Sequence, residues 1–133
     1  MPVEDVSREA QVILDATKTG EARGLDQASV SDFFKAQIEA SKLLQYSLLA
    51  EWRRFGRAPD HKAINLGSKI RPELDQVDTA LVSELAQTAR IRASASCRTD
   101  IAKAVGKFVS ARRNSFSPLK AIALDRALAA ACR

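Results

Sequence analysis

One uninterrupted run, from Phe33 to Trp52, constrains the fold of this chain more than any other stretch. It reads FFKAQIEASKLLQYSLLAEW and contains no glycine or proline, and its apolar residues recur at the spacing of one helical face. That apolar stripe consists of Phe34, Ile38, Leu48 and Trp52, with Phe33, Leu44 and Leu49 at its edges. The run therefore predicts a long helix with one side turned toward a core.

Three polar residues interrupt this stripe. Gln37, Ser41 and Gln45 follow one another at intervals of four, so they stack on the same face of the helix. A buried amide or hydroxyl group is destabilising unless another group hydrogen-bonds it. The helix must therefore pack against polar partners on a neighbouring helix or line a polar pocket, and the spacing alone does not decide between the two.

The composition favours a single all-α domain over residues 1–133. The chain has 133 residues, of which 46% are hydrophobic and 28% charged, and glycine, proline and aromatic residues are few. No segment approaches the roughly 20 apolar residues of a membrane span, so we expect no membrane partner. The first ten residues, MPVEDVSREA, are too acidic and polar for a signal peptide.

The net charge of +5 and the pI of about 9.6 raise the question of an anionic partner. The arginines come in scattered pairs, at 53–54, 90/92 and 112–113. There is no dense basic tract, no helix-turn-helix spacing and no zinc-finger pattern, so a nucleic-acid partner is not expected. A basic solvated surface explains the charge as well, and a small dianion would need only a few buried cations.

Two cysteines, Cys97 and Cys132, leave two interpretations open. One cysteine lies beside the last residue, which suits a disulfide that ties down a C-terminal helix, and the alternative is two buried thiols. The chain has no Cys-x-x-Cys motif and a single histidine, His61, so we expect no metal site and no cofactor.

Capping and helix-breaking residues predict the first helix over residues 2–24. Asp5 or Ser7 can serve as its N-cap, and Gly24 is its stop signal. The apolar spacing gives it a buried stripe of Val6, Ala10, Ile13 and Thr17. Asp5, Arg8 and Glu9 gather on its first turn, which taken alone indicates a capping acid and a surface ion pair.

The same signals place the other helices. The long helix is expected from its N-cap Asp26 to about residue 55, and the next from 68 to about 92, with Leu74, Val77, Leu81, Leu85 and Thr88 buried. A shorter helix capped by Thr99 should reach about residue 111. The last should run from Ser117-Pro118 to the terminus, burying Leu119, Ile122, Ala123, Leu128 and Ala129. The prediction is thus a bundle of about five helices, two of them long.

Two motifs resemble the secreted or periplasmic AroQ gamma-type chorismate mutases. In the long helix the family carries a phenylalanine, then Q-I-x-A-[ST], a Gln or Glu followed by Tyr, and soon a Trp. This chain has Phe34, Gln37-Ile38, Ala40-Ser41, Gln45-Tyr46 and Trp52. Near the N-terminus the family motif P-[IV]-E-D-x-x-R-E appears in full as PVEDVSRE.

The resemblance implies an isomerase that converts chorismate to prephenate in a helical pocket, with chorismate as its small-molecule partner. It assigns Arg8 and Gln45 to catalysis, because the Arg holds a substrate carboxylate and the Gln faces the ether oxygen. It assigns Arg71, in the context R-P-x-L-D, to a second carboxylate, with Lys69 as the alternative at that position. Substrate contacts also fall to Ser41, Asp5 and Glu9.

The resemblance further implies an exported protein with a disulfide between Cys97 and Cys132. The family has another helix before P-[IV]-E-D, and that helix supplies an Arg and a Lys, so the chain is expected to lack this N-terminal helix. The apolar stripes then uncovered would favour a homodimer. Two other functions stay open: a non-catalytic helical protein that binds anionic metabolites, and a basic helical adaptor that binds nucleic acid.

Overall fold

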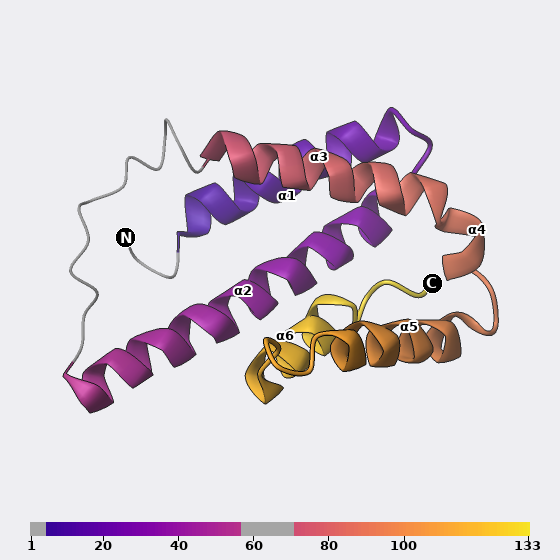
Figure 1. The fold of residues 1–133 in the computed structure, drawn as a ribbon. Coiled ribbons are helices and arrows are strands. Elements are labelled where there is room, and N and C mark those ends of the chain that lie inside the picture. Colours follow the sequence, from indigo (N-terminus) through magenta and orange to yellow (C-terminus); the bar gives the residue numbers. More distant parts are fainter. Residues whose placement is uncertain (1–4, 57–70) are drawn as a thin grey trace.

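The computed structural model describes residues 5–56 and 71–133, and within these ranges the regular structure consists of six helices (Figure 1). They are α1 (Val6–Glu21), α2 (Gln27–Phe55), α3 (Arg71–Gln87), α4 (Ala89–Arg92), α5 (Cys97–Ala111) and α6 (Pro118–Ala127). The long helix α2 runs diagonally across the molecule, with α1 and α3 on one side and α5 and α6 on the other (Figure 1). The predicted all-α bundle is confirmed, and the added sixth helix arises because the stretch expected to be one helix forms both α3 and α4.

Side-chain caps fix where three of the helices begin. Asp5, Asp26 and Ser117 each accept a hydrogen bond from the backbone N–H three residues later, as predicted from the sequence. The helix α2 ends as expected at Phe55, where Gly56 adopts a left-handed backbone with φ of 62°. Local sequence signals therefore set the limits of α2 and the start of α1 and α6.

The main core surrounds the N-terminal half of α2. Its buried members come from four parts of the chain: Ala16, Val30, Phe33, Phe34, Val82, Leu85 and Ala131. A smaller cluster joins Ala40 of α2 to Ala123 and Ala127 of α6. The predicted stripe does not continue along α2, because Leu44 and Leu48 are 37% and 45% exposed. The N-terminal half of α2 thus carries most of the packing.

The buried face of α1 differs from the predicted one. Val6 is 77% exposed, whereas Ala16 and Gly20 are buried. The reason is close approach to α2, since a Cβ atom on Gly20 would lie 2.9 Å from Cγ2 of Val30. Small residues therefore face α2, and Val6 at the start of the helix faces solvent.

A break at Thr88 separates α3 from α4. The Thr88 hydroxyl donates a hydrogen bond to the carbonyl of Glu84 at 2.7 Å, and the backbone of Thr88 leaves the helical region. In the first turns of α3, Leu74 and Val77 are about half exposed, at 49% and 53%, instead of buried as expected. The core of this helix is formed by Val82 and Leu85.

The C-terminal helices also differ in detail from the expected ones. The helix α5 begins at Cys97 after Ser96, and Thr99 lies inside its first turn instead of capping it. The helix α6 ends at Ala127, short of the terminus, and its buried residues are Ala123 and Ala127. Ile122, expected inside, is 57% exposed. Alanines face α2 at this contact because the two helix backbones pack closely there.

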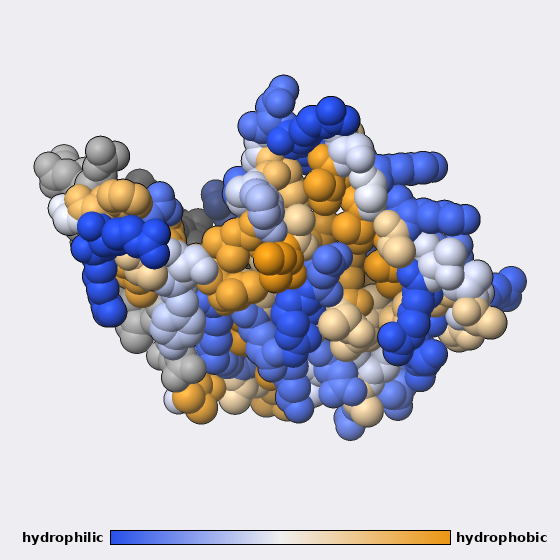
Figure 2. Space-filling view, turned by 90° about the horizontal axis from the view of Figure 1, so that it is seen from below, coloured by the Kyte–Doolittle hydropathy of each residue, from blue (hydrophilic) through white to orange (hydrophobic). Residues whose placement is uncertain are grey.

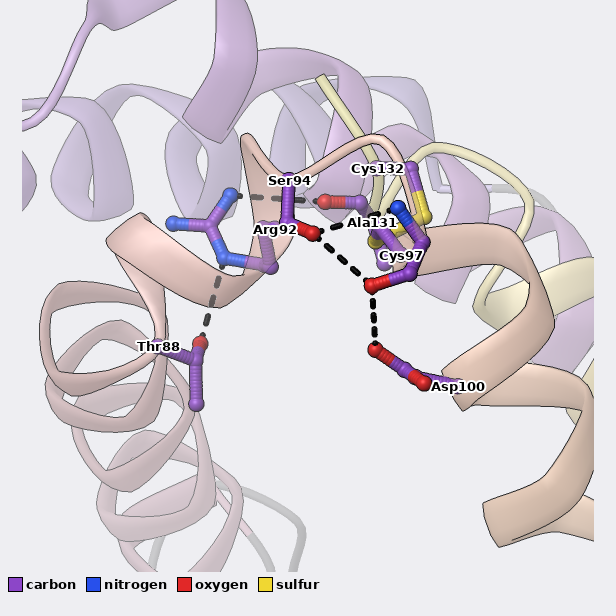
Figure 3. The surroundings of a disulfide bond; sticks show 8 residues. Thr88, Arg92, Ser94, Cys97, Asp100, Ala131 and Cys132 are labelled. Atoms are coloured by element: carbon purple, nitrogen blue, oxygen red, sulfur yellow. Dashed lines mark hydrogen bonds between the residues drawn. A yellow bond between two sulfur atoms is a disulfide. The ribbon is translucent and has the colours of Figure 1, made fainter.

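A disulfide joins Cys97, at the start of α5, to Cys132, which confirms the bridge expected from the resemblance (Figure 3). The bridge closes a chain segment that contains α5 and α6, and the Cα atoms of the two cysteines are 5.8 Å apart. Beside it, the backbone N–H of Arg133 donates to the carbonyl of Arg92 at 3.0 Å. The C-terminal segment is thereby attached to both α4 and α5.

Arg92 is buried next to this bridge, and each nitrogen of its guanidinium donates a hydrogen bond. Its Nε donates to the Thr88 hydroxyl at 3.2 Å, and its Nη2 donates to the carbonyl of Leu85 at 2.6 Å. Its Nη1 donates to the carbonyl of Ala131 at 3.4 Å, a bond visible in Figure 3. Burial, followed by the nearby charge of Arg133, lowers the pKa of Arg92. This arginine is a structural connection between α3 and the C-terminus.

Apolar side chains also reach the surface. The face in Figure 2 shows apolar patches between charged side chains, and each of the six described helices carries at least one large exposed hydrophobic residue. None of the helices in residues 5–56 and 71–133 is both long and apolar enough to cross a lipid bilayer.

Candidate functional site

A cavity of about 390 Å³ lies between α1, the middle of α2 and the first turns of α3. This volume is in the range typical of small-molecule sites. Its polar lining residues are Asp5, Arg8, Glu9, Gln37, Ser41, Lys42, Gln45 and Asp78, and its apolar ones are Val12, Phe34, Ile38, Leu74, Val77 and Leu81. Five of the six ligand-contacting residues expected from the sequence therefore meet at one cavity.

The first turn of α1 organises one wall. Asp5 caps the helix by accepting the Arg8 N–H at 3.0 Å, and Glu9 Oε2 accepts the Asp5 N–H at 3.1 Å. These reciprocal bonds resemble a capping box, with the acid one residue further along. They fix the backbone from which the Arg8 and Glu9 side chains reach the cavity.

The interrupted stripe of α2 forms the opposite wall. Gln37 donates to the carbonyl of Ala127 on α6 and also lines the cavity. It therefore both packs against a polar partner on a neighbouring helix and lines a polar pocket, the two alternatives that the sequence left open. Gln45 donates through Nε2 to the Ser41 hydroxyl at 2.9 Å, and both residues are exposed at the open side. A terminal amide nitrogen carries two hydrogens, so this bond leaves Gln45 a second donor. Ser41 thereby orients the amide.

Lys42 is a lining residue that the sequence did not single out. Its ammonium lies 2.7 Å from Glu9 Oε1, and each of the two side chains is 23% exposed. Lysine within an amphipathic helix is normally a solvated residue, so only its neighbours Ser41 and Gln45 could have pointed to it. The pair joins α1 to α2 across the cavity wall.

The first turns of α3 close the cavity with apolar and acidic side chains. Leu74 and Val77 line it, which explains why these two residues are not in the core. Arg8 Nη2 donates to Asp75 Oδ1 at 3.0 Å, so α3 also contacts the arginine of α1. Burial, followed by the charge of Asp75, raises the pKa of Asp78, and the charge of Arg8 opposes this shift.

Arg71, the second expected carboxylate ligand, begins α3, and its side chain lies outside the described part of the structure. The alternative at that position, Lys69, is itself outside the described residues, as is His61. The α3 helix does bring its N-terminal turns to the cavity, as Leu74 and Val77 show. The expectation for Arg71 therefore stays a prediction.

The cavity suits a small, partly apolar ligand. Its charged lining residues within the described part of the chain are two cations, Arg8 and Lys42, and three acids, Asp5, Glu9 and Asp78. Its described lining combines the cations Arg8 and Lys42 with the hydroxyl and amide groups of α2, over an apolar floor that includes Phe34. Phe34 is 1% exposed and also belongs to the main core, so the floor is rigid. Within residues 5–56 and 71–133, no cluster of three His, Cys, Asp or Glu side chains could hold a metal ion.

The known proteins that this chain resembles, in sequence and in structure, are chorismate mutases. No protein-family model matches the chain. The secreted chorismate mutase of Mycolicibacterium smegmatis is 30% identical over 131 residues, which is 98% of this chain and 71% of the relative. The crystal structure of chorismate mutase from Burkholderia phymatum is 38% identical, with a TM-score of 0.89, and is matched over 100% of this chain and 80% of its own.

A second solved structure agrees. The chorismate mutase from Burkholderia thailandensis is 33% identical, with a TM-score of 0.90, over 99% of this chain and 82% of its own. Sequence and fold thus agree along nearly the whole chain, including the three helices that enclose the cavity. This chain belongs to the chorismate mutase family and is an all-α isomerase of that family.

Proposed function

We propose that the cavity between α1, α2 and α3 is where chorismate rearranges to prephenate. The observation that carries this proposal is the convergence of Arg8, Ser41 and Gln45, from two distant sequence motifs, on one cavity of suitable size. The relatives' names favour the enzyme over a non-catalytic metabolite-binding protein or a nucleic-acid adaptor.

The reaction itself needs few catalytic groups. A Claisen rearrangement breaks one carbon–oxygen bond and forms one carbon–carbon bond in a single step, without a nucleophile, a metal ion or an exchanged proton. Catalysis then rests on holding the folded conformer and on charge complementary to the ether oxygen as its bond breaks. A cavity with fixed donors and a rigid apolar floor meets both needs.

Arg8 is proposed to bind one substrate carboxylate. The contact with Asp75 engages Nη2, and a guanidinium has five N–H donors in a planar fork that matches a carboxylate. The side chain is 25% exposed, so a ligand entering the cavity can reach it. Arg71 is proposed, from the resemblance, to bind the second carboxylate. Glu9 is proposed to accept a hydrogen bond from a substrate hydroxyl group, and Asp5 to hold the start of α1 in place.

Gln45 is proposed to donate to the ether oxygen. Its Nε2 already donates one hydrogen to Ser41, which directs the amide and leaves the other hydrogen for a ligand. A neutral amide donates at any pH near neutrality, whereas a carboxylic acid at the same position must be protonated to do so. Ser41 is proposed to contact a substrate carboxylate or hydroxyl as well.

The first test is the loss of chorismate absorbance in wild type and in Gln45→Ala. Removing one donor to developing negative charge typically lowers kcat by about 10²-fold, and we expect a loss of that order. Gln87→Ala is the matched control, because Gln87 donates to Ser83 in the same i to i−4 pattern on α3 and does not line the cavity. Equal turnover in wild type and Gln45→Ala would refute the assignment, and a folded wild type without turnover would refute the proposed function.

Gln45→Glu gives a second test through pH. If the residue must donate, the variant loses kcat as pH rises above the pKa of the introduced carboxyl group, because ionisation removes its donor. Wild type should keep a nearly constant kcat between pH 6 and 8. A wild-type decline over that range, with folding intact, would contradict the amide as the donor.

We also propose that this protein works in an oxidising compartment, secreted or periplasmic. The Cys97–Cys132 disulfide supports this, since such bonds persist outside the reducing cytosol. The Mycolicibacterium smegmatis relative is named a secreted enzyme. Fractionation of the native host, with the bridge measured by thiol labelling, would test it, and a cytosolic protein with two labelled thiols would refute it.

A homodimer is proposed from the exposed apolar side chains of α2. Leu44, Leu48 and Phe55 are 37%, 45% and 61% exposed, and they lie on the part of the helix beyond the main core. Contiguous apolar surface of this kind commonly marks an interface. Sedimentation equilibrium would test the assembly, and a monomer at micromolar concentrations would refute it.

A further inference from the structure

Lys42 occupies a distinctive position in the cavity. It follows Ser41 on α2 and precedes Gln45 by three residues, so all three side chains reach the same space. Its side chain is only 23% exposed, and its ammonium lies 2.7 Å from Glu9 Oε1. A lysine held at this depth in a substrate cavity has a defined position instead of a freely moving solvated one.

Glu9 is itself anchored, so the ammonium is held in place by a fixed partner. Its other oxygen accepts the backbone N–H of Asp5 at 3.1 Å, at the capped start of α1. Two carboxylate oxygens therefore connect the helix start to Lys42. The result is a cation from α2 that lines the same cavity as Arg8 of α1.

The charges around the cavity show why a second cation matters. Among its described lining residues, Arg8 and Lys42 are the cations, and Asp5, Glu9 and Asp78 are the acids. A substrate with two carboxylates is repelled by the acids and needs a cation near each carboxylate, because an uncompensated charge loses its solvation on entering the cavity. Arg8 on α1 and Lys42 on α2 both line the cavity, so each is available to a carboxylate of one ligand.

We propose that Lys42 binds a carboxylate of the dianionic substrate, as a further cation beside Arg8 and the proposed ligand Arg71. The inference rests on the proposed function. A lysine ammonium is a compact charge on a flexible stem with three donors, so a ligand carboxylate can share it with Glu9 or replace Glu9. The competing explanation is that Lys42 only neutralises the charge of Glu9 and keeps α1 against α2.

Four proteins separate these explanations: wild type, Lys42→Gln, Glu9→Gln and the double variant. If Lys42 contacts substrate, Lys42→Gln lowers kcat/KM about tenfold or more, chiefly through KM, and does so again in the Glu9→Gln background. If Lys42 only neutralises Glu9, the double variant regains the kcat/KM of Glu9→Gln, and the proposal is overturned. The double variant also avoids leaving Glu9 as a partly buried charge without Lys42, so it stays measurable if Lys42→Gln folds poorly.

Two further variants complete the experiment. Lys42→Arg keeps the cation and should restore most of the KM lost in Lys42→Gln. Lys35→Gln removes the same charge from an exposed position on α2 outside the cavity, and its KM should equal that of wild type. A KM for Lys35→Gln raised as much as that for Lys42→Gln would mean a general charge effect and overturn the proposal. Turnover by wild type with unchanged kinetics in Lys42→Gln refutes only the role of Lys42, whereas a folded wild type without turnover refutes the proposed function.

Discussion

Removing the disulfide should lower stability without changing the candidate substrate site. The sequence separation of Cys97 and Cys132 is 35 residues. On the chain-entropy relation, a closed loop of that length restricts the unfolded chain by about 12.7 cal/mol/K, which is about 3.8 kcal/mol at 25 °C. Cys97 is 2% exposed, so both cysteines are best replaced by alanine, because a buried serine hydroxyl would add its own desolvation penalty.

Urea unfolding followed by far-UV circular dichroism measures the difference between wild type and the double Cys→Ala variant. We expect a loss of about 3.8 kcal/mol in the free energy of unfolding. Dithiothreitol should lower the stability of wild type toward that of the variant and should leave the variant unchanged. The described cavity residues all come from α1 with its N-cap Asp5, from α2 and from α3, so KM for chorismate should not change while the variant stays folded.

Two results would refute this reasoning. A loss below about 1 kcal/mol with an unchanged m-value would mean that the bridge does not restrict the unfolded chain as the relation requires. A rise in KM at temperatures where the variant is fully folded would mean that the C-terminal helices help to shape the cavity.

Two further substitutions probe charge and packing. Burial above all raises the pKa of Asp78 from 3.8, so the folded protein holds this proton more tightly than the unfolded chain does, and wild-type stability falls as pH rises from 3.8 through the raised pKa. The stability of Asp78→Asn relative to wild type should therefore be higher at pH 7 than at pH 3. Urea unfolding at both pH values measures this, and a difference between the two proteins that does not change with pH would contradict the prediction. Gly20→Ala should lose about 1–3 kcal/mol, because its Cβ would lie 2.9 Å from the buried Val30 side chain. Gly106→Ala on α5 has no neighbour within 4 Å and should instead gain about 0.5–1 kcal/mol, so equal thermal shifts for the two glycine variants would show that contact with Val30 is not what matters.

Signals carried by single residues predicted the starts of α1, α2 and α6 and the end of α2, but not the start of α5 or the end of α6. The caps at Asp5, Asp26 and Ser117 depend on a local hydrogen bond that any suitable side chain makes wherever the helix packs. The buried face of each helix was harder to predict, because periodicity records where apolar residues recur and takes no account of the distance between packed helices. At the contact of α1 with α2, the close approach at Gly20 selects small residues, so Val6 is exposed.

The candidate site was predicted chiefly through its two motifs. Arg8, Ser41 and Gln45 do meet at one cavity, and the spacing within α2 alone had already suggested a polar pocket. Lys42 and Asp78 were missed because a lysine or aspartate in an amphipathic helix has the same local pattern whether it faces solvent or a cavity. Only the packing of α1 and α3 beside α2 distinguishes these cases, and that packing is set by residues far apart in the chain.

Phe34 links the candidate cavity to the stability of the whole bundle. It is 1% exposed, belongs to the main core and forms part of the cavity floor. A smaller side chain there would enlarge the cavity and would also remove core packing, which typically lowers stability by about 3–5 kcal/mol. Leu74 and Val77 of α3 also line the cavity and are half exposed, so they carry no such penalty. If the proposed function holds, evolution can reshape substrate preference through the first turns of α3, while the cavity floor stays fixed by the demands of folding.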